Sequence, residues 1–274
     1  MAGSPPIDPG ALARALKASI VSRALALADA PMRAAWLQAT VRTHPIAPLA
    51  AALDLLCLDA EQAVPDAREV MMSLVQVVND PAFDELAQRL REEASGRALA
   101  SLARLLRRPI ELERDDDGES ERAREARVPD YGGRRPLTLG ERKALARKPT
   151  RAAFDKLLRD PHPAVIHNLL DNPKLTEDDV VRLAARRPPR AEILTVVARS
   201  GRWTARPRVR MAVVLNPGAP PELAVPLVAL LVRHELRLVL QMTDAHPAVR
   251  AAARELLLRR PPSLGRAGRL DGAG

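Results

Sequence analysis

The near absence of aromatic side chains limits the fold of this chain more than any other feature of its sequence. Only five of 274 residues are aromatic, namely Trp36, Phe83, Tyr131, Phe154 and Trp203. Hydrophobic residues nevertheless make up 47% of the chain, so a large core has to be built from Leu, Val and Ala. β-Sandwiches and barrels rely on aromatic and β-branched residues, and no alternating apolar–polar run here has the pattern of a strand. The sequence therefore predicts an all-α protein.

Apolar residues recur at helical spacing throughout the first 108 residues. Val70, Leu74 and Val78, for example, are spaced by four residues and would lie on one face of a helix. Pro or Asp stands at the expected helix starts, and Gly, Pro or Asn at the expected ends. We expect helices over residues 9–28, 31–43, 45–58, 66–78, 80–96 and 99–106.

Basic residues are concentrated in the second half of the chain. The formal net charge is +9. Residues 1–108 carry 12 Lys or Arg against 12 Asp or Glu, whereas residues 137–260 carry 23 against 12, a net charge of +11. Of the 43 basic residues 38 are Arg, a bias typical of high-GC bacterial genomes. The number of arginines is therefore weak support for ligand binding by itself.

Residues 109–136 separate the two halves. They carry 6 Lys or Arg against 9 Asp or Glu and almost no apolar residue, which is the composition of a solvated linker. The run Asp115–Asp117 lacks the fixed geometry that a divalent cation needs, so we interpret it as part of that linker. The sequence predicts four segments: a helical N-terminal domain (1–108), an acidic disordered linker (109–136), a helical-repeat domain (137–260) and a flexible tail (261–274).

Three segments of the second half align with one another. Pro163, Pro207 and Pro247 are 44 and 40 residues apart, and Asn-Pro pairs at 172 and 216 keep the spacing of 44. Proline suits the first position of a helix, and the residue before a proline disfavours helical continuation. Further helices are expected over 176–185, 191–200, 222–232 and 234–242, with Pro226 kinking its helix or beginning it later. An internal period of this size is typical of a helical solenoid, whose repeats bury their apolar faces by stacking.

The third segment resembles the HEAT-repeat signature in these residues: Asp244, Pro247, Val249, Arg250, Ala253 and Leu257. Asn172–Pro173, followed by the acidic helix start Glu177–Asp179, is similar to the leucine-rich-repeat-variant pattern. The resemblance covers roughly residues 150–260. It implies a HEAT-like α-solenoid in which Asp and Arg positions link neighbouring repeats. Only the third segment holds both, since Ile166 replaces the Arg of the first and Thr204 the Asp of the second.

Motifs for catalysis are missing from the sequence. It contains no glycine-rich phosphate loop, and Leu238 stands where a metalloprotease helix beginning at His234 would need its second histidine. His162 and His246 occupy equivalent repeat positions before proline, so we interpret them as helix-entry residues. Cys57 is the single cysteine and lies in an apolar run, typical of a small buried side chain. We therefore expect no enzyme activity, no cofactor and no metal site.

The best candidate for a binding surface is basic. It comprises Arg182, Arg186, Arg187, Arg190, Arg202, Trp203, Arg206 and Arg210. Clustered arginines could clamp acidic side chains of a protein, or bind phosphates of a nucleic acid while an exposed Trp203 stacks on a base. The third interpretation is a solvated face, with Trp203 packed under a loop and arginine stems covering apolar surface.

These observations favour a non-catalytic cytosolic adaptor or regulatory protein that binds another protein through a helical-repeat surface. Analogy with similar scaffolds suggests a bacterial signalling, polarity or GTPase-linked assembly. The alternative is a HEAT-like protein that binds nucleic acid through its basic face. The N-terminus lacks the basic start and apolar block of a signal peptide. The longest apolar stretch, residues 223–232, is shorter than the ~20 residues that span a bilayer, so we expect a cytoplasmic protein without membrane insertion.

Overall fold

The computed structural model describes residues 8–107, 128–132 and 135–260. Every regular element in these ranges is a helix and none is a strand, which confirms the all-α prediction. The helices of the first half are α1 (Pro9–Leu25), α2 (Ala30–Thr43), α3 (Ile46–Glu61), α4 (Pro65–Val78), the 3₁₀ turn η1 (Pro81–Phe83), α5 (Asp84–Gly96) and α6 (Ala100–Leu105). None of the helices described here is long and apolar enough to cross a membrane.

Helix α3 is the centre of the first half, where it packs against α1, α4, α5 and α6. Leu49, Leu53, Leu56 and Ala60 are all buried because their spacing of three or four residues places them on one side of the helix. Phe83 is the one aromatic residue among the buried residues of this half, so aliphatic side chains supply the rest of the core. The predicted Leu, Val and Ala core is thereby confirmed for the first half.

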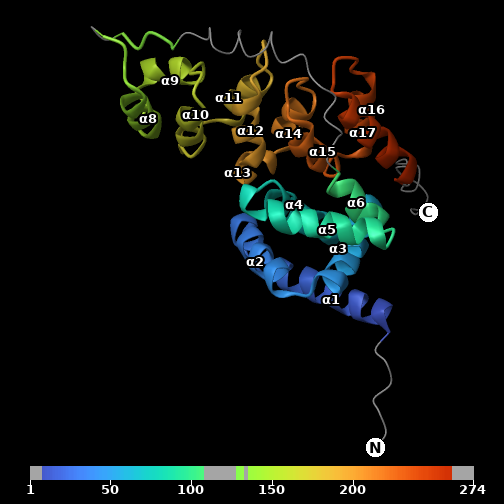
Figure 1. Ribbon diagram of the computed structural model, residues 1–274. Coiled ribbons are helices and arrows are strands. Elements are labelled where there is room, and N and C mark those ends of the chain that lie inside the picture. Colours follow the sequence, from blue (N-terminus) through green and yellow to red (C-terminus); the bar gives the residue numbers. More distant parts are fainter. Residues whose placement is uncertain (1–7, 108–127, 133–134, 261–274) are drawn as a thin grey trace, which may run out of the picture.

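The described part of the second half can be divided into three successive groups of helices. Its helices are α8 (Leu139–Arg147), α9 (Arg151–Leu157), α10 (Pro163–Leu170), α11 (Glu177–Ala184), α12 (Ala191–Arg199), α13 (Gly201–Thr204), α14 (Pro207–Val214), α15 (Pro221–Val228), α16 (Arg233–Gln241) and α17 (Pro247–Arg259). We call α8–α10 unit 1, α11–α14 unit 2 and α15–α17 unit 3. In each unit the first helix packs against the last. Figure 1 shows the units following one another in chain order beside the first half.

The period found in the sequence corresponds to these units. Pro163, Pro207 and Pro247 each begin the last helix of a unit, as predicted. His162 and His246 accept a hydrogen bond through Nδ1 from the backbone N–H two residues later, at 3.1 Å in both cases. Their interpretation as helix-entry residues is therefore confirmed. The local signals for helix starts were reliable because they depend on residues only two or three positions away.

A side chain at the end of each last helix bonds to carbonyl groups at the end of the first helix. The Nδ2 group of Asn172 donates to the carbonyls of residues 146 and 147, at 3.3 and 3.0 Å. That of Asn216 donates to the carbonyls of residues 184 and 186, at 2.7 and 3.4 Å. In unit 3 the guanidinium of Arg260 donates to the carbonyls of residues 229 and 231. These carbonyls lack partners within their own helices, so the side chains satisfy them and connect the two helices.

Asp160 organises a second buried cluster, in unit 1. Its carboxylate accepts hydrogen bonds from Nη1 of Arg142 and from the hydroxyl of Tyr131, each at 2.7 Å. The backbone N–H of His162 also donates to it, at 2.9 Å. Burial and the bond to this carboxylate raise the pKa of Tyr131 well above its usual value. Asp160 is thus paired with Arg142, a residue that was not singled out from the sequence.

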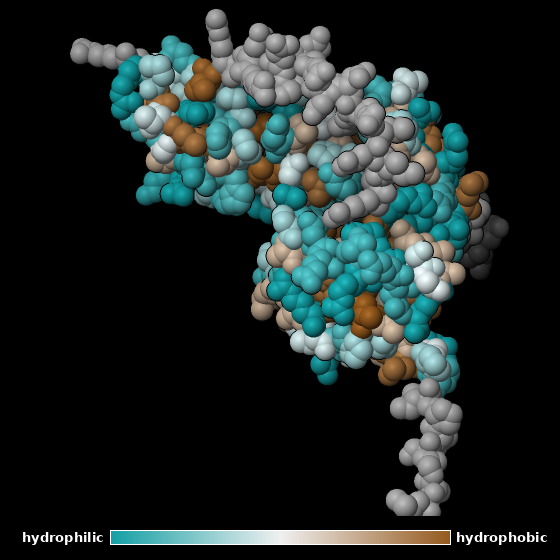
Figure 2. Space-filling model, in the orientation of Figure 1, coloured by the Kyte–Doolittle hydropathy of each residue, from teal (hydrophilic) through white to brown (hydrophobic). Residues whose placement is uncertain are grey.

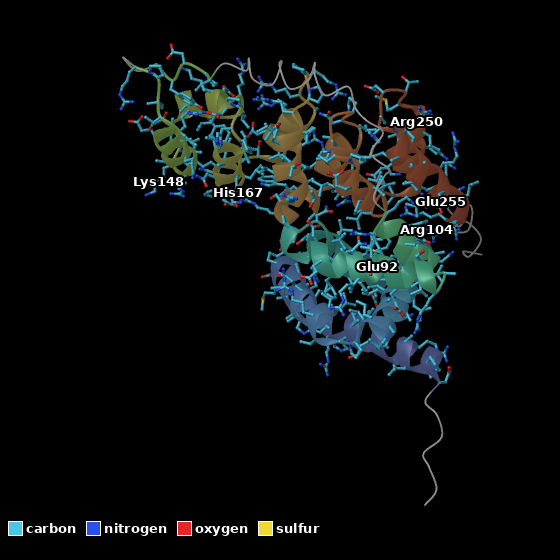
Figure 3. The ribbon with its side chains drawn as sticks, in the orientation of Figure 1. Glu92, Arg104, Lys148, His167, Arg250 and Glu255 are labelled. Atoms are coloured by element: carbon cyan, nitrogen blue, oxygen red, sulfur yellow. The ribbon has the colours of Figure 1, made fainter. Side chains whose placement is uncertain are left out.

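The two halves of the chain are in direct contact. Arg104 on α6 donates to the carboxylate of Glu61 at 2.8 and 2.6 Å, and its Nη1 lies 3.6 Å from Oε1 of Glu255 on α17. Figure 3 shows Arg104 and Glu255 pointing toward each other across this junction. Nη2 of Arg68 on α4 donates to the carbonyl of Leu230 at 2.9 Å. One hydrophobic core runs through both halves, so the first half packs on the repeat units.

Three sequence expectations differ from the structure or lie outside it. Helices α8 and α9 were not predicted, although Thr138 and Glu141 form a capping box at the start of α8, in which the Glu141 N–H donates to Oγ1 of Thr138 at 3.3 Å. Helix α15 begins at Pro221 and contains Pro226, so of the two predicted effects of Pro226, a kink or a later helix start, the later start is excluded. Most of the predicted linker, with its run at 115–117, and the tail at 261–274 lie outside the described residues.

Candidate functional site

Trp203 does not belong to the surface, which corrects its place in the predicted basic face. Its side chain is 1% exposed, and its Nε1–H donates to the carbonyl of Leu170 at 2.8 Å. The guanidinium groups of Arg202 and Arg206 lie over the ring, 4.8 and 5.3 Å from its centroid. A large apolar ring with one polar group is most stable when the ring is buried and the N–H is bonded. Trp203 therefore supports packing between units 1 and 2 and cannot stack on a base.

Arg210 is the second correction to the predicted face. It is 7% exposed, and its Nη1 donates to the carbonyls of Thr204 and Ala205 at 2.9 and 2.7 Å. These carbonyls end α13, where the partial negative charge of a helix terminus favours a cation. Burial lowers the pKa of Arg210 from its usual value. Its role in the structure is to cap a helix.

Carboxylates in the first turn of α11 pair with several of the remaining arginines. Arg182 pairs with Asp179. Arg206 lies 3.1 Å from the carboxylate of Glu177, and Arg208 lies 2.6 Å from that of Asp178. Acidic side chains are favoured in this turn by the helix dipole, and the fold of unit 2 brings α14 beside them. The structure thus matches these arginines with carboxylates of the same unit.

Arg186, Arg187 and Arg190 lie around the turn between α11 and α12. Burial, together with the positive charges of Arg159 and Arg190, lowers the pKa of Arg186. Arg187 lies 3.4 Å from the carboxylate of Asp244, and both side chains of that pair are about half exposed. Exposed ion pairs of this kind contribute only about 0–1 kcal/mol and exchange readily with other partners. The positive charge around this turn is therefore available to an outside carboxylate.

An open apolar groove runs past this turn, between α11, α14 and α16. It encloses about 500 Å³. Its lining includes Val181 and Ala185 on the α11 side, Met211, Ala212 and Leu215 on α14, and Leu238 and Met242 on the α16 side. The polar members are Arg187, Arg208, Asn216, His234 and Glu235. We call this feature the docking groove.

Leu238 and Met242 make the groove unusual. They are 47% and 39% exposed, although both are large apolar side chains. Leu236 and Val239 on the same helix are fully buried, so α16 presents apolar residues on two sides. On the face shown in Figure 2, apolar residues form small patches among hydrophilic ones over both halves. Exposed apolar surface that is contiguous usually marks a contact site.

The sequence analysis did not find this groove, although one signal for it was present. Residues 236, 238, 239, 240 and 242 are all apolar, which is more than one buried stripe of a short helix requires. The remaining lining comes from α11 and α14, which are separated from α16 by many residues. Only the packing of units 2 and 3 brings these helices together.

The cavity that contains the single cysteine is small. A cavity of about 20 Å³ at the junction of the halves, lined in part by Cys57, Glu61 and Arg104, has room for about one water molecule. Burial raises the pKa of the Cys57 thiol well above its usual value, which opposes formation of a nucleophilic thiolate. Among the described residues, no three His, Cys, Asp or Glu side chains are grouped as a metal site requires.

Comparison with known proteins finds no family model, no curated protein and no solved structure that matches this chain.

Proposed function

We propose that this protein is a non-catalytic adaptor with HEAT-like repeats, and that it binds another protein in the cytoplasm. The observation that carries the proposal is the docking groove, with Leu238 and Met242 exposed at its edge. Burying those two side chains against a partner would remove apolar surface from water, the main favourable contribution to protein association. The first half packs against α13 and α15, which in turn pack against α14 of the groove.

A protein partner accounts for these features better than a nucleic acid. The groove is mainly apolar, whereas nucleic-acid surfaces are predominantly charged and use aromatic side chains for stacking. Trp203, the only aromatic residue of the predicted basic face, is buried. Arg182 and Arg206 already pair with Asp179 and Glu177 of α11, whose carboxylates are largely buried, and this reduces their availability to phosphates. Because residues 137–260 carry a net charge of +11, the experiment below also tests for nucleic-acid binding.

Affinity capture with groove variants tests this proposal. The full chain is immobilised as wild type, Leu238→Asp and Leu258→Asp, and is exposed to lysate with and without nuclease. Leu258 is 83% exposed on α17 and does not line the groove, so it provides the same chemical change outside the site. The adaptor proposal predicts a discrete protein that survives nuclease, is retained by Leu258→Asp and is lost with Leu238→Asp.

Two other results would overturn the proposal. A protein retained equally by all three forms would place the binding site outside the groove. Recovery of nuclease-sensitive material alone, abolished by Arg182→Glu/Arg186→Glu, would instead establish nucleic-acid binding through the basic face. Circular dichroism of each variant shows whether the fold is intact, so that loss of binding is not confused with unfolding.

A further inference from the structure

We propose that the partner segment of the docking groove is an acidic amphipathic α-helix, seated with its apolar side on Leu238, Met211 and Met242 and its carboxylates against Arg187 and Arg208. The inference rests on the proposed protein-binding function and adds the chemistry of the partner. Three properties of the groove carry it: an apolar lining, the absence of pairing edges and a positively charged rim.

The lining suits a row of aliphatic side chains. The groove is open, lies between three helices and has a volume of about 500 Å³. Two of the six methionines in the chain, Met211 and Met242, line it. Methionine is unbranched and flexible, so it can fit side chains of different shapes. The groove can therefore accept Leu, Ile, Phe or Met from a partner.

The surrounding secondary structure favours a helical partner over an extended one. An extended peptide gains much of its affinity by adding a strand to the exposed edge of a sheet. The part of the chain that the structure describes contains only helices, and the groove is lined by three of them. A helical partner satisfies its own backbone groups and presents apolar side chains at positions i, i+3, i+4 and i+7.

The rim favours carboxylates on that helix. Arg187 and Arg208 are the rim cations, and their partners within the chain are the exposed Asp244 and Asp178. Because both pairs are exposed and weak, a carboxylate from the partner can replace either of them. Glu235 also lines the groove, but it is 8% exposed and accepts a hydrogen bond from the Val232 N–H at 2.8 Å. Its charge is therefore directed to the protein interior.

Residues farther from the groove also carry a net positive charge, as the rim arginines do. Asn216 lines both the groove and a smaller pocket that contains Arg186 and Arg190. Residues 137–260 as a whole carry a net charge of +11, which would accelerate the approach of an acidic segment. An acidic helix is thus attracted over long range and paired at short range.

A displayed library of random peptides, about 16 residues long, tests the partner chemistry without knowledge of the natural partner. The full wild-type chain is panned, and each enriched peptide is synthesised and titrated by fluorescence anisotropy. We expect enriched peptides to carry apolar residues at helical spacing with Asp or Glu beside them, and to gain helical circular dichroism on binding. Affinity should fall about ten-fold or more for Leu238→Asp and less than about two-fold for Leu258→Asp.

Two double variants with the same change in net charge measure how much the rim arginines contribute to peptide affinity. Arg187→Glu/Arg208→Glu changes the net charge as much as Arg254→Glu/Arg259→Glu, whose arginines are exposed on α17 and do not line the groove. The proposal predicts that the first pair weakens peptide binding about ten-fold more than the second. Equal effects would show that only the overall field matters and would refute the pairing with Arg187 and Arg208.

The remaining outcomes distinguish failure of the acidic-helix proposal from failure of the proposed protein-binding function. Groove-dependent peptides that are basic, or that bind without becoming helical, would refute the acidic helix while leaving a protein-binding groove intact. The inference would be refuted if the affinity of the enriched peptides were unchanged by Leu238→Asp, or if no peptide were enriched. In either case the capture experiment with lysate tests the adaptor proposal independently. Dimerisation of the wild type in sedimentation, abolished by Leu238→Asp, would assign the groove to a second copy of the chain and refute the inference.

Discussion

Replacing Asn216 by alanine tests the physical basis of the repeat. Asn216 is 2% exposed and bonds in both directions: Nδ2 donates to the carbonyl of Ala184 at 2.7 Å, and Oδ1 accepts from Gly218 N–H at 3.1 Å. A weaker contact reaches the carbonyl of Arg186 at 3.4 Å. Alanine removes all three contacts and leaves buried backbone groups without partners.

The expected loss follows from those contacts. A hydrogen bond contributes about 1 kcal/mol, and a buried group left unsatisfied costs about 1–3 kcal/mol. We therefore expect Asn216→Ala to lower the free energy of unfolding by about 2–4 kcal/mol. Asn216→Asp keeps the acceptor for Gly218 but places a carboxylate oxygen against the carbonyl of Ala184. It should be at least as destabilising as alanine.

Urea unfolding followed by circular dichroism at 222 nm measures these differences. Gln241→Ala is the control, because Gln241 is exposed at the end of α16 and alanine is a good helix former. The control should change the free energy of unfolding by less than about 0.5 kcal/mol. An Asn216→Ala protein as stable as this control, or an aspartate variant as stable as wild type, would refute the claim that the side chain connects α11 to α14.

Three further predictions concern other buried and capping groups. Asp160→Asn leaves the Arg142 guanidinium buried without its counter-charge, so we expect a loss of about 3–5 kcal/mol in urea unfolding; a loss below about 1 kcal/mol would contradict the buried pair. Trp203→Phe removes the 2.8 Å bond to the Leu170 carbonyl and should lower stability by about 1–3 kcal/mol; the part of the tryptophan fluorescence that this variant loses should be the part shielded from iodide quenching in the wild type, which also contains Trp36. Hydrogen bonds from Arg135 and then from Thr138 lower the pKa of Glu141 from 4.5 to about 2. Because the folded value is lower, this stabilisation is complete above pH 4.5 and is lost as the pH falls toward about 2. Thermal melts of Glu141→Gln should therefore depend less on pH across that window than those of wild type, and parallel curves would disprove the assignment.

Helix starts and the internal period could be predicted because their causes are local. Pro163, Pro207 and Pro247 begin helices, since proline lacks only an N–H that the first turn does not use. His162 and His246 act within two residues of their own position. The spacing of Asn172 and Asn216 marked the ends of two units, although their bonds to α8 and α11 could not be foreseen. Those bonds span 25 to 32 residues and depend on how the helices pack.

The candidate site was predicted less well. The arginines of 182–210 were identified by their number and clustering, but that pattern does not distinguish a solvated guanidinium from a buried cap. Arg210 and Arg182 are similar in sequence context, yet one bonds to the carbonyls that end α13 and the other is exposed beside Asp179. Whether an arginine is buried depends on which helix packs over it, and that information is absent from its neighbours along the chain.

The sequence by itself determined the helical class, because a chain with five aromatic residues and no alternating runs can bury Leu, Val and Ala most readily between helices. It also determined the positions of the prolines that begin the last helix of each unit. Tertiary structure alone decided that the two halves pack together through Arg68, Arg104 and Glu255. It also decided that α11, α14 and α16 enclose the groove. The reason is that helix formation follows from contacts three or four residues apart, whereas a groove is formed by side chains from separate helices that meet only after folding.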